Sequence, residues 1–551
     1  MTVTVTRPRK HSEAGPGSPA AAGFWPLLHA EWTKFRTVRG WLIGLFVAAI
    51  LTLVFGVLTA NAEIGCGPTK SGRACLPHIP IGPGGEAVND TFYFVHQPLT
   101  GNGTITVRVT SLTGKVVDGG GRVRVPAPGE AQSSPSLTPE VVPWAKAGII
   151  IKEKILPGSA YAAMLVTGSH GVRMQYNYTG DLAGLPGDVS ATSPRWLRLV
   201  RAGEEITGYD SADGTHWSKV GEITLAGLPS VVQVGLFATS PIYLQASPFF
   251  GGSQLTGGPS EATAVLDHVR LTGQKVASRW TGLDVGNANP GSGAPGPAGP
   301  NEPGFNGFHE AHGAFTVTGS GDISPLTPGP GGGYPSSTIE SNLSGGFAGL
   351  IVIVVVAVMF FTAEYRRGLI RITLAASPRR GQVLAAKAAV AGLAAFVVGV
   401  VAAIVSIDLG DSKQRSEGLF ILPVSALTEV RVIVGMAGVL ALAAMLAVAL
   451  GALLRRSAMA ITAAVAIIVL PFLLAVIGVF PAGVANWLLR LTPAAGWAVE
   501  QSIPHYSQVN QLGRAADGIY PLPPWAGFAV LAAWTGAALA LALIALRRRD
   551  A

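Results

Sequence analysis

The run Gly346-Phe-Ala-Gly-Leu-Ile-Val-Ile-Val-Val-Val-Ala-Val-Met-Phe-Phe-Thr362 contains no charged residue. Its length approaches the roughly 20 apolar residues that a helix needs to cross a lipid bilayer. Similar apolar runs occur at residues 41–60, 388–407, 433–454, 458–480 and 525–546. None of these runs has an acidic or basic residue near its middle, so the sequence predicts an all-α membrane bundle of six transmembrane helices.

The composition excludes several other classes of protein. Only 13% of the 551 residues are charged, against about 25% in an ordinary soluble protein, which argues against a disordered chain or a coiled coil. Two cysteines are too few for a zinc ribbon or a disulfide-rich scaffold. Residues 61–345 carry a net charge of −4 and the rest of the chain carries +12. This distribution favours membrane topology over nucleic-acid binding, and we expect no nucleic-acid partner.

The basic residues also predict an orientation. With the N-terminus in the cytoplasm, the inner segments are 1–40, 363–387, 455–457 and 547–551, and they hold 17 Lys/Arg and 4 Asp/Glu. The short outer loops, 408–432 and 481–524, hold 5 Lys/Arg and 6 Asp/Glu. Cytoplasmic loops are enriched in Lys and Arg. We therefore expect a multi-pass protein of the plasma membrane, in contact with its lipids. Both termini would be cytoplasmic, with residues from about 61 to 345 outside.

The outer segment is expected to be an all-β, jelly-roll-like sandwich over residues 63–285. Short strand-like runs, several of them alternating with period 2, are separated by turn residues. These runs lie at 92–95, 103–110, 147–152, 161–166, 171–178, 195–201, 231–238 and 262–271. Residues 286–344 read as a linker rich in Gly and Pro, with one more strand beginning near Phe315.

The remaining boundaries follow from this division. Residues 1–24 are expected to form a disordered cytoplasmic tail, and residues 25–62 an interfacial helix followed by the first span. Residues 345–549 would hold the second to sixth spans. Ala60-Asn61-Ala62 fits the pattern of a signal-peptide cleavage site, although the 40 residues before the apolar run are far more than a usual signal peptide has.

Cys66 and Cys75 follow the first apolar run and are separated by eight residues. In an oxidising compartment we expect them to form a disulfide, because the intervening Gly and Pro allow the loop to close. The alternative is a pair of free thiols, or metal ligands without further partners.

The segment after the second span combines basic and apolar residues in one short loop. It reads Glu364-Tyr-Arg-Arg-Gly-Leu-Ile-Arg371 and continues as Leu374-Ala-Ala-Ser-Pro-Arg-Arg-Gly-Gln-Val-Leu-Ala-Ala-Lys387. Pro378 ends its helical part and turns the chain towards the next span. Such an element can lie on the membrane or dock a partner. The alternative is anchoring by positive charge alone.

These two motifs resemble the loop after the second span of type-2 ABC exporter permeases, especially actinobacterial members. The N-terminal stretch Leu27-Leu-His-Ala-Glu-Trp-Thr-Lys-Phe-Arg-Thr-Val-Arg-Gly40 resembles the interfacial helix before their first span. The resemblance covers roughly residues 27–60 and 345–549. The insertion of about 280 residues between the first two spans is unusual for this class.

The resemblance implies a permease subunit that is not itself an enzyme. A separate ABC ATP-binding subunit would bind ATP and Mg²⁺, and two permease halves, identical or different, would form the pathway. No Gly-x-x-x-x-Gly-Lys-Ser/Thr motif occurs in this chain, so we expect no cofactor of its own. The residues implied to couple to the ATP-binding subunit are Glu31, Trp32, Lys34, Arg36, Glu364, Tyr365, Arg366, Arg367, Gly368, Arg379 and Arg380. We predict no catalytic or metal-binding residues.

The outer domain more loosely resembles concanavalin A-like or laminin-G-like sandwiches. The resemblance rests on residues 196–201, 209–217 and 266–271, and it implies a glycan ligand as one role of the domain. A lectin-like surface protein without transport activity is therefore the alternative function. A membrane enzyme acting on glycans is a weaker rival, because no convincing nucleophile, carboxylate pair or metal cluster supports it.

Overall fold

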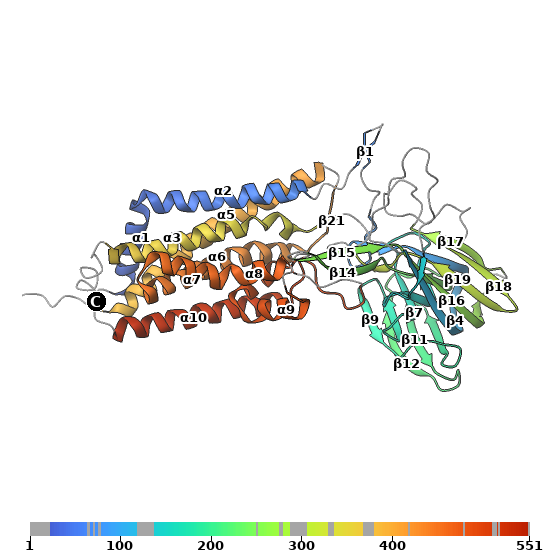
Figure 1. The fold of residues 1–551 in the computed structure, drawn as a ribbon. Helices are drawn as coiled ribbons and strands as arrows, with labels where there is room; N and C mark the ends of the chain where they lie inside the picture. The colour runs from blue at the N-terminus through green and yellow to red at the C-terminus, as the bar shows by residue number, and fades with distance from the viewer. Residues whose placement is uncertain are drawn as a thin grey trace, which may run out of the picture.

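The computed structural model describes most of the chain and divides it into a helical bundle and a β domain at opposite ends (Figure 1). The residues that the structure describes are 23–62, 67–69, 72–74, 79–117, 137–249, 252–274, 279–286, 306–328, 336–366, 379–416, 419–477, 480–509, 515 and 518–548.

Six helical segments of the described residues are long and apolar enough to cross a membrane, which confirms the predicted number. They are α2 (Arg39–Ala62), α3 (Gly346–Arg366), α5 (Arg380–Ser416), α6 (Ala426–Leu454), the pair α7 (Ser457–Ile468) and α8 (Leu470–Val476), and α10 (Pro524–Arg548). The fifth segment is broken just before Pro471, which lacks the N–H that would continue the helix. Helix α5 extends past both ends of its apolar run.

Helix α6 lies at the centre of the bundle. Most of its apolar stretch is buried, whereas α2, α7, α8 and α10 turn most of theirs outwards. Small residues bring the central helices close together. A Cβ atom on Gly399 of α5, for example, would lie only 2.8 Å from the Cα of Ala437 of α6. Close backbone approach at small residues is typical of packing between helices in membranes.

The loop before α10 contains α9 (Ala482–Leu491) and the 3₁₀ helix η3 (Pro493–Glu500). All eight residues of η3 are buried, and Trp497 stacks on Phe347 of α3 with 5.1 Å between ring centroids. The ring of Trp487 is 59% exposed. Of these two tryptophans, Trp487 is therefore the one whose ring could lie at a membrane–water interface. Trp497 is buried with η3 against the end of α3.

The β domain is one large sheet that curls into a nearly closed, sandwich-like barrel (Figure 1). Its main path runs β12-β11-β10-β4-β13-β6-β7-β8-β9, with β5, β16, β17, β18 and β19 added at the side. The bounds of these strands are β4 (Phe92–Val117), β5 (Leu137–Pro139), β6 (Lys146–Lys152), β7 (Tyr161–Thr167), β8 (Val172–Tyr176), β9 (Gly180–Ala183), β10 (Arg195–Ala202), β11 (Glu205–Ser211), β12 (Ser218–Thr224), β13 (Val231–Thr239), β16 (Ser260–Gln274), β17 (Thr281–Val285), β18 (Gly307–Ala311) and β19 (Ala314–Gly319). A separate hairpin joins β14 (Tyr243–Phe249) to β15 (Gly252–Gly258).

The long strand β4 connects the two layers of the sheet. Its first half pairs with β13 and β17, and its second half pairs with β10 and β16. Side chains alternate between the faces of a strand. Val95 and Leu99 therefore point into the core between the layers, while Phe92 and Phe94 point to a second core on the opposite face.

That second core is covered by two segments of the chain, residues 79–90 and 320–327, which we call the strap. Within the strap, β3 (Val88–Asp90) pairs antiparallel with β20 (Ile323–Pro325). Val88 and Ile323 pack against the aromatic residues of the sheet. The β domain thus continues beyond residue 285. Any ligand of the domain would have to bind outside the area that the strap covers.

Two buried lysines tie the strap to the sheet. The Lys152 ammonium donates to Asp90 Oδ2 at 2.7 Å and to the Tyr178 hydroxyl at 3.2 Å, and both ionic side chains are fully buried. The Lys146 ammonium donates to Asp322 Oδ1 at 2.6 Å. Each buried charge therefore has an opposite charge within hydrogen-bond distance, as burial requires.

The strap also lies against the loops at the end of the bundle nearest the β domain. Ile79, Ala87 and Leu326 form a small core with Leu422. Strand β21 (Ser336–Ser337) pairs with β22 (Phe420–Ile421), and the Gln508 amide donates to the Tyr178 carbonyl at 3.3 Å. The β domain is thus joined to the helical part at Leu422 and at Gln508.

Cys66 and Cys75 lie outside the described residues, so their disulfide stays a prediction. Between them, β1 (Gly67–Thr69) and β2 (Gly72–Ala74) pair antiparallel. We expect iodoacetamide to modify neither cysteine of the unreduced protein, and both after reduction, as measured by peptide mass spectrometry. In the control variant Cys66→Ser, Cys75 should be modified without reduction. Modification of both cysteines in the unreduced wild type would contradict the disulfide.

Candidate functional site

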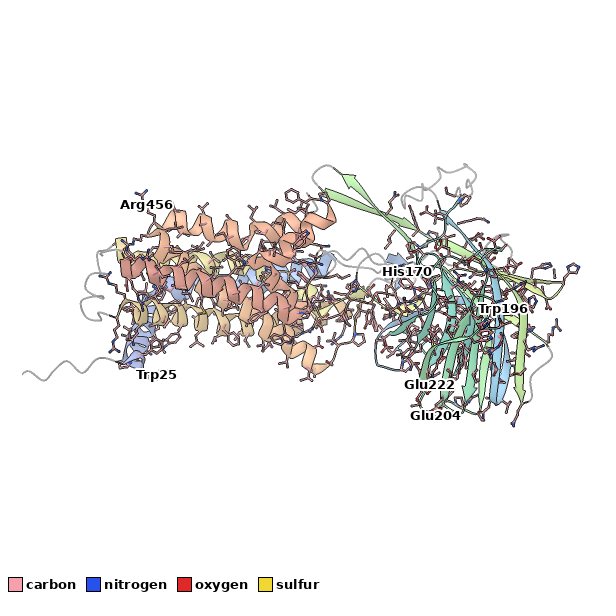
Figure 2. The ribbon with its side chains drawn as sticks, turned by 90° about the horizontal axis from the view of Figure 1, so that it is seen from below. Trp25, His170, Trp196, Glu204, Glu222 and Arg456 are labelled. Atoms are coloured by element: carbon pink, nitrogen blue, oxygen red, sulfur yellow. The ribbon has the colours of Figure 1, made fainter. Side chains whose placement is uncertain are left out.

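Helix α1 (Phe24–Thr37) lies at the end of the bundle remote from the β domain (Figure 1). Its Phe35 is almost fully buried and meets Phe360 of α3 edge-on, with 5.1 Å between ring centroids. Trp25, on the same helix, and Arg456 mark this end of the bundle in Figure 2. The described residues of the segments predicted to face the cytoplasm therefore lie together at the end of the bundle remote from the β domain.

Beside Phe35, four charged side chains from three helices form what we call the charge cluster: Glu31, Lys34, Glu364 and Lys387. The Lys387 ammonium of α5 donates to Glu31 Oε2 of α1 and to Glu364 Oε1 of α3, both at 2.7 Å. Lys34 donates to Glu31 Oε1 at 2.7 Å and to Glu364 Oε1 at 3.3 Å. The cluster thus joins α1, the end of α3 and the beginning of α5.

The charge cluster is neutral as a whole and mostly removed from solvent. The side chains of Glu31 and Lys387 are fully buried and that of Glu364 is 12% exposed. Lys387 also lies over the Phe360 ring, 4.8 Å from its centroid, in a cation–π contact. Burial by itself lowers the pKa of Lys34, but the hydrogen bonds and charges of Glu31 and Glu364 together outweigh it, and the net pKa is raised. Buried charges of this kind persist only when each is paired.

Residues 367–378 lie outside the described residues, and the chain before and after this predicted loop is held separately. Before the loop, the Tyr365 ring lies 5.4 Å from the guanidinium of Arg455 at the end of α6. After it, Arg380 donates to the Leu546 carbonyl of α10 at 2.7 Å. The chain on both sides of the loop is therefore fixed to the bundle.

The structure brings together some of the predicted coupling residues and not others. Glu31, Lys34 and Glu364 meet in the charge cluster, and Tyr365 and Arg380 hold the loop ends. Trp32, Arg36 and Arg379 are exposed outside the cluster. The side chain of Arg366, and the whole of Arg367 and Gly368, lie outside the described residues.

Lys387 lies at the centre of the charge cluster. It was not among the coupling residues predicted from the sequence. It stands in the run Leu-Ala-Ala-Lys-Ala-Ala, at the border of an apolar span. An ionisable residue inside such a segment is by itself a sign of function or pairing. Its partners could not be read from the sequence, because Glu31 precedes it by 356 residues.

The described residues contain no group of three or more His, Cys, Asp or Glu side chains that could hold a metal ion.

Comparison with known proteins leaves the family open. No family model and no curated protein matches the chain. Among solved structures, a functionally unknown protein from Saccharomyces cerevisiae is 13% identical over 36% of this chain and 84% of its own, with a TM-score of 0.20. Scytalido-glutamic peptidase is 6% identical over 43% of this chain and 100% of its own, with a TM-score of 0.23. A mutant GH43 protein, BlXynB from Bacillus licheniformis, is 14% identical over 31% of this chain and 27% of its own, with a TM-score of 0.17. These TM-scores are too low to support any inference about fold or activity.

Proposed function

We propose that the chain is the permease subunit of an ATP-driven ABC exporter in the plasma membrane. Both termini and the charge cluster would face the cytoplasm, and the β domain would face outwards. A separate ATP-binding subunit would supply hydrolysis, with ATP and Mg²⁺ bound there. A second permease half, identical or different, would complete the pathway for a substrate that is not yet identified.

The charge cluster is the observation that supports this proposal. The resemblance assigns the interfacial helix and the loop after the second span to docking of the ATP-binding subunit. In the structure, Lys387 after that loop pairs with Glu31 of that helix at 2.7 Å, and Lys34 of the helix pairs with Glu364 before the loop at 3.3 Å. A push on either docking element would therefore move α1, α3 and α5 together. Packed helices joined by ion pairs can transmit such a movement without bending.

Co-purification from the native membrane tests the proposal. We expect an ATP-binding subunit to accompany the chain, and its ATPase activity to fall about tenfold in Glu364→Gln and in Arg367→Ala, which corresponds to about 1.4 kcal/mol in activation free energy. Glu364→Gln weakens the link to Lys387, and Arg367→Ala removes a charge from the loop.

The matched control is Arg456→Ala, which removes an exposed basic residue at the same end of the bundle (Figure 2). This variant should retain the wild-type ATPase activity. If the wild-type chain purifies without any nucleotide-binding subunit, the permease proposal fails.

A further inference from the structure

The layer of the sheet that lies away from the strap has an outer face that is only half-buried. This layer consists of β10, β11, β12, β16 and the second half of β4. Leu197, Leu199 and Val107 point from it into the core between the layers. Because side chains alternate along a strand, Arg198 and Thr106 point to the outer face instead, where each is partly exposed.

Five residues of this outer face stand in register on five neighbouring strands. Tyr209 of β11 is paired with Lys219 of β12 and with Arg198 of β10. Thr106 of β4 is paired in turn with Arg198 and with Arg270 of β16. Residues that are paired across antiparallel strands have their side chains on the same face. We call these five residues the cross-strand row, which spans about 19 Å at about 4.8 Å per strand.

Arg198 lies at the centre of the cross-strand row and has no counter-charge. Its guanidinium lies over the Trp217 ring, 3.7 Å from the centroid, and its Nε donates to Thr106 Oγ1 at 3.2 Å. None of the described residues forms an ion pair with Arg198 or accepts a hydrogen bond from its two terminal NH₂ groups. Burial lowers the pKa of Arg198, and the nearby Tyr209 offsets only part of this effect. A partly buried cation is costly without a counter-charge, which a bound anion would supply.

The other charges of this face leave a second arginine uncompensated. Lys219, at one end of the row, pairs with Glu222 at 2.7 Å, and Arg108, on the same face, pairs with Asp267 at 2.6 Å. Arg270, at the other end of the row, is exposed and forms no ion pair within the described part of the chain. The two arginines of the row are two strand spacings apart, which places their Cα atoms about 10 Å from each other.

We infer that the cross-strand row binds an acidic polysaccharide in which sugars that carry a carboxylate alternate with neutral sugars. Arg198 would donate two parallel hydrogen bonds to one carboxylate, the arrangement in which a guanidinium binds this group most strongly. Arg270 would meet the next carboxylate. The Thr106 and Tyr209 hydroxyls would bind hydroxyl groups of the sugars between and beside the two charges. One sugar extends such a chain by about one strand spacing, so carboxylates on every second sugar match arginines on every second strand.

The charge of the surrounding domain favours this ligand over a nucleic acid. Residues 61–345 carry a net charge of −4, and Glu222 and Glu205 both act on Lys219 at one end of the row (Figure 2). A nucleic acid carries a phosphate at every step and binds through many Lys and Arg contacts, so its backbone would meet these carboxylates. A chain with neutral sugars between its charges can place a neutral sugar there. This inference does not depend on the proposed transport function.

The test uses an octasaccharide of alternating glucuronic acid and N-acetylglucosamine, and the same octasaccharide with its carboxylates reduced to alcohols. Each is titrated into the full chain in lipid nanodiscs, without nucleotide or any ATP-binding subunit. Binding is followed by isothermal titration calorimetry, with the signal of empty nanodiscs subtracted. We expect the acidic form to bind about tenfold more tightly than the neutral form, because only the acidic form pairs with the two arginines.

Substitutions on and off the row locate the binding site. Arg198→Gln and Arg270→Gln should each lower the affinity for the acidic octasaccharide by about tenfold, since each removes a charge-assisted hydrogen bond. Arg270 is exposed, so its substitution is not expected to disturb folding. The control is Lys154→Gln, which removes an exposed basic residue just after β6 of the other layer and should bind like the wild type.

A thymidine oligonucleotide with the same number of charges is the comparison for general attraction of anions, and it should bind at least tenfold more weakly than the acidic octasaccharide. Equal binding of the oligonucleotide would overturn the inference. So would equal affinity for the acidic and neutral octasaccharides in the wild type, or an affinity for the acidic form that is unchanged in either arginine variant.

Discussion

Replacing Lys387 by methionine is expected to lower the free energy of unfolding by about 3–5 kcal/mol, because it leaves the buried Glu31 and Glu364 with a single partner, Lys34. Removing one member of a buried ion pair costs this much since the other charge stays in a medium of low polarity. The measurement is unfolding of the purified full chain by titration with SDS in mixed micelles.

The double variant Lys387→Met/Glu364→Gln separates loss of charge balance from loss of packing. It leaves the 2.7 Å pair of Glu31 and Lys34 intact and restores neutrality, so we expect it to regain more than half of the lost stability. Lys219→Met, in an exposed pair with Glu222, is the control and should show no measurable change. A Lys387→Met variant as stable as this control would contradict the role assigned to the cluster.

Lys152→Met in the β domain is the second substitution with a large expected effect. It removes the only ammonium within hydrogen-bond distance of Asp90 among the described residues, and both side chains are fully buried. We expect the free energy of unfolding to fall by about 3–5 kcal/mol, and we expect the strap to detach from the sheet before the rest of the domain unfolds. In hydrogen exchange of the full chain, the amides of β3 and β20 should lose protection before those of β11, because β3 pairs with β20 within the strap whereas β11 pairs with β10 and β12.

The paired variant Lys152→Met/Asp90→Asn removes both charges and should recover much of the protection of β3. Lys154→Met serves as the control, because Lys154 is 59% exposed and pairs with the adjacent Glu153. Unchanged exchange at Val88–Asp90 in Lys152→Met would show that Asp90 does not hold the strap.

The apolar runs were predictable because the number of consecutive apolar residues that crosses a bilayer is a local property. The run containing Gly346 and Thr362 corresponds to α3, and Pro471 marks the break between α7 and α8. The β character of the outer segment was similarly visible in alternating residues such as Phe92 and Val95. Local patterns of this kind do not specify which strands pair. The strap, and the pairing of the two halves of β4 with different strands, therefore emerged only in the structure.

Of the candidate site, Glu31, Lys34 and Glu364 were predicted, although as parts of two separate docking elements. Their central partner, Lys387, was not predicted as a site residue. An ion pair is a relation in space, and these residues are joined across separations of up to 356 positions. A cavity lined by Glu86 of the strap and by loops of the bundle was also invisible, because the loop residues of the bundle that line it lie more than 300 positions after Glu86 in the chain.

The sequence by itself determined the six apolar segments, the charge asymmetry of their flanks and the presence of a β domain between the first two. Each of these depends on composition or on a period of a few residues. Only the tertiary structure decided how buried charges are neutralised: Lys387 by two carboxylates from α1 and α3, and Lys152 by Asp90 of the strap. The reason is physical, since a charge removed from water requires an opposite charge within a few ångströms, and only folding brings distant residues that close.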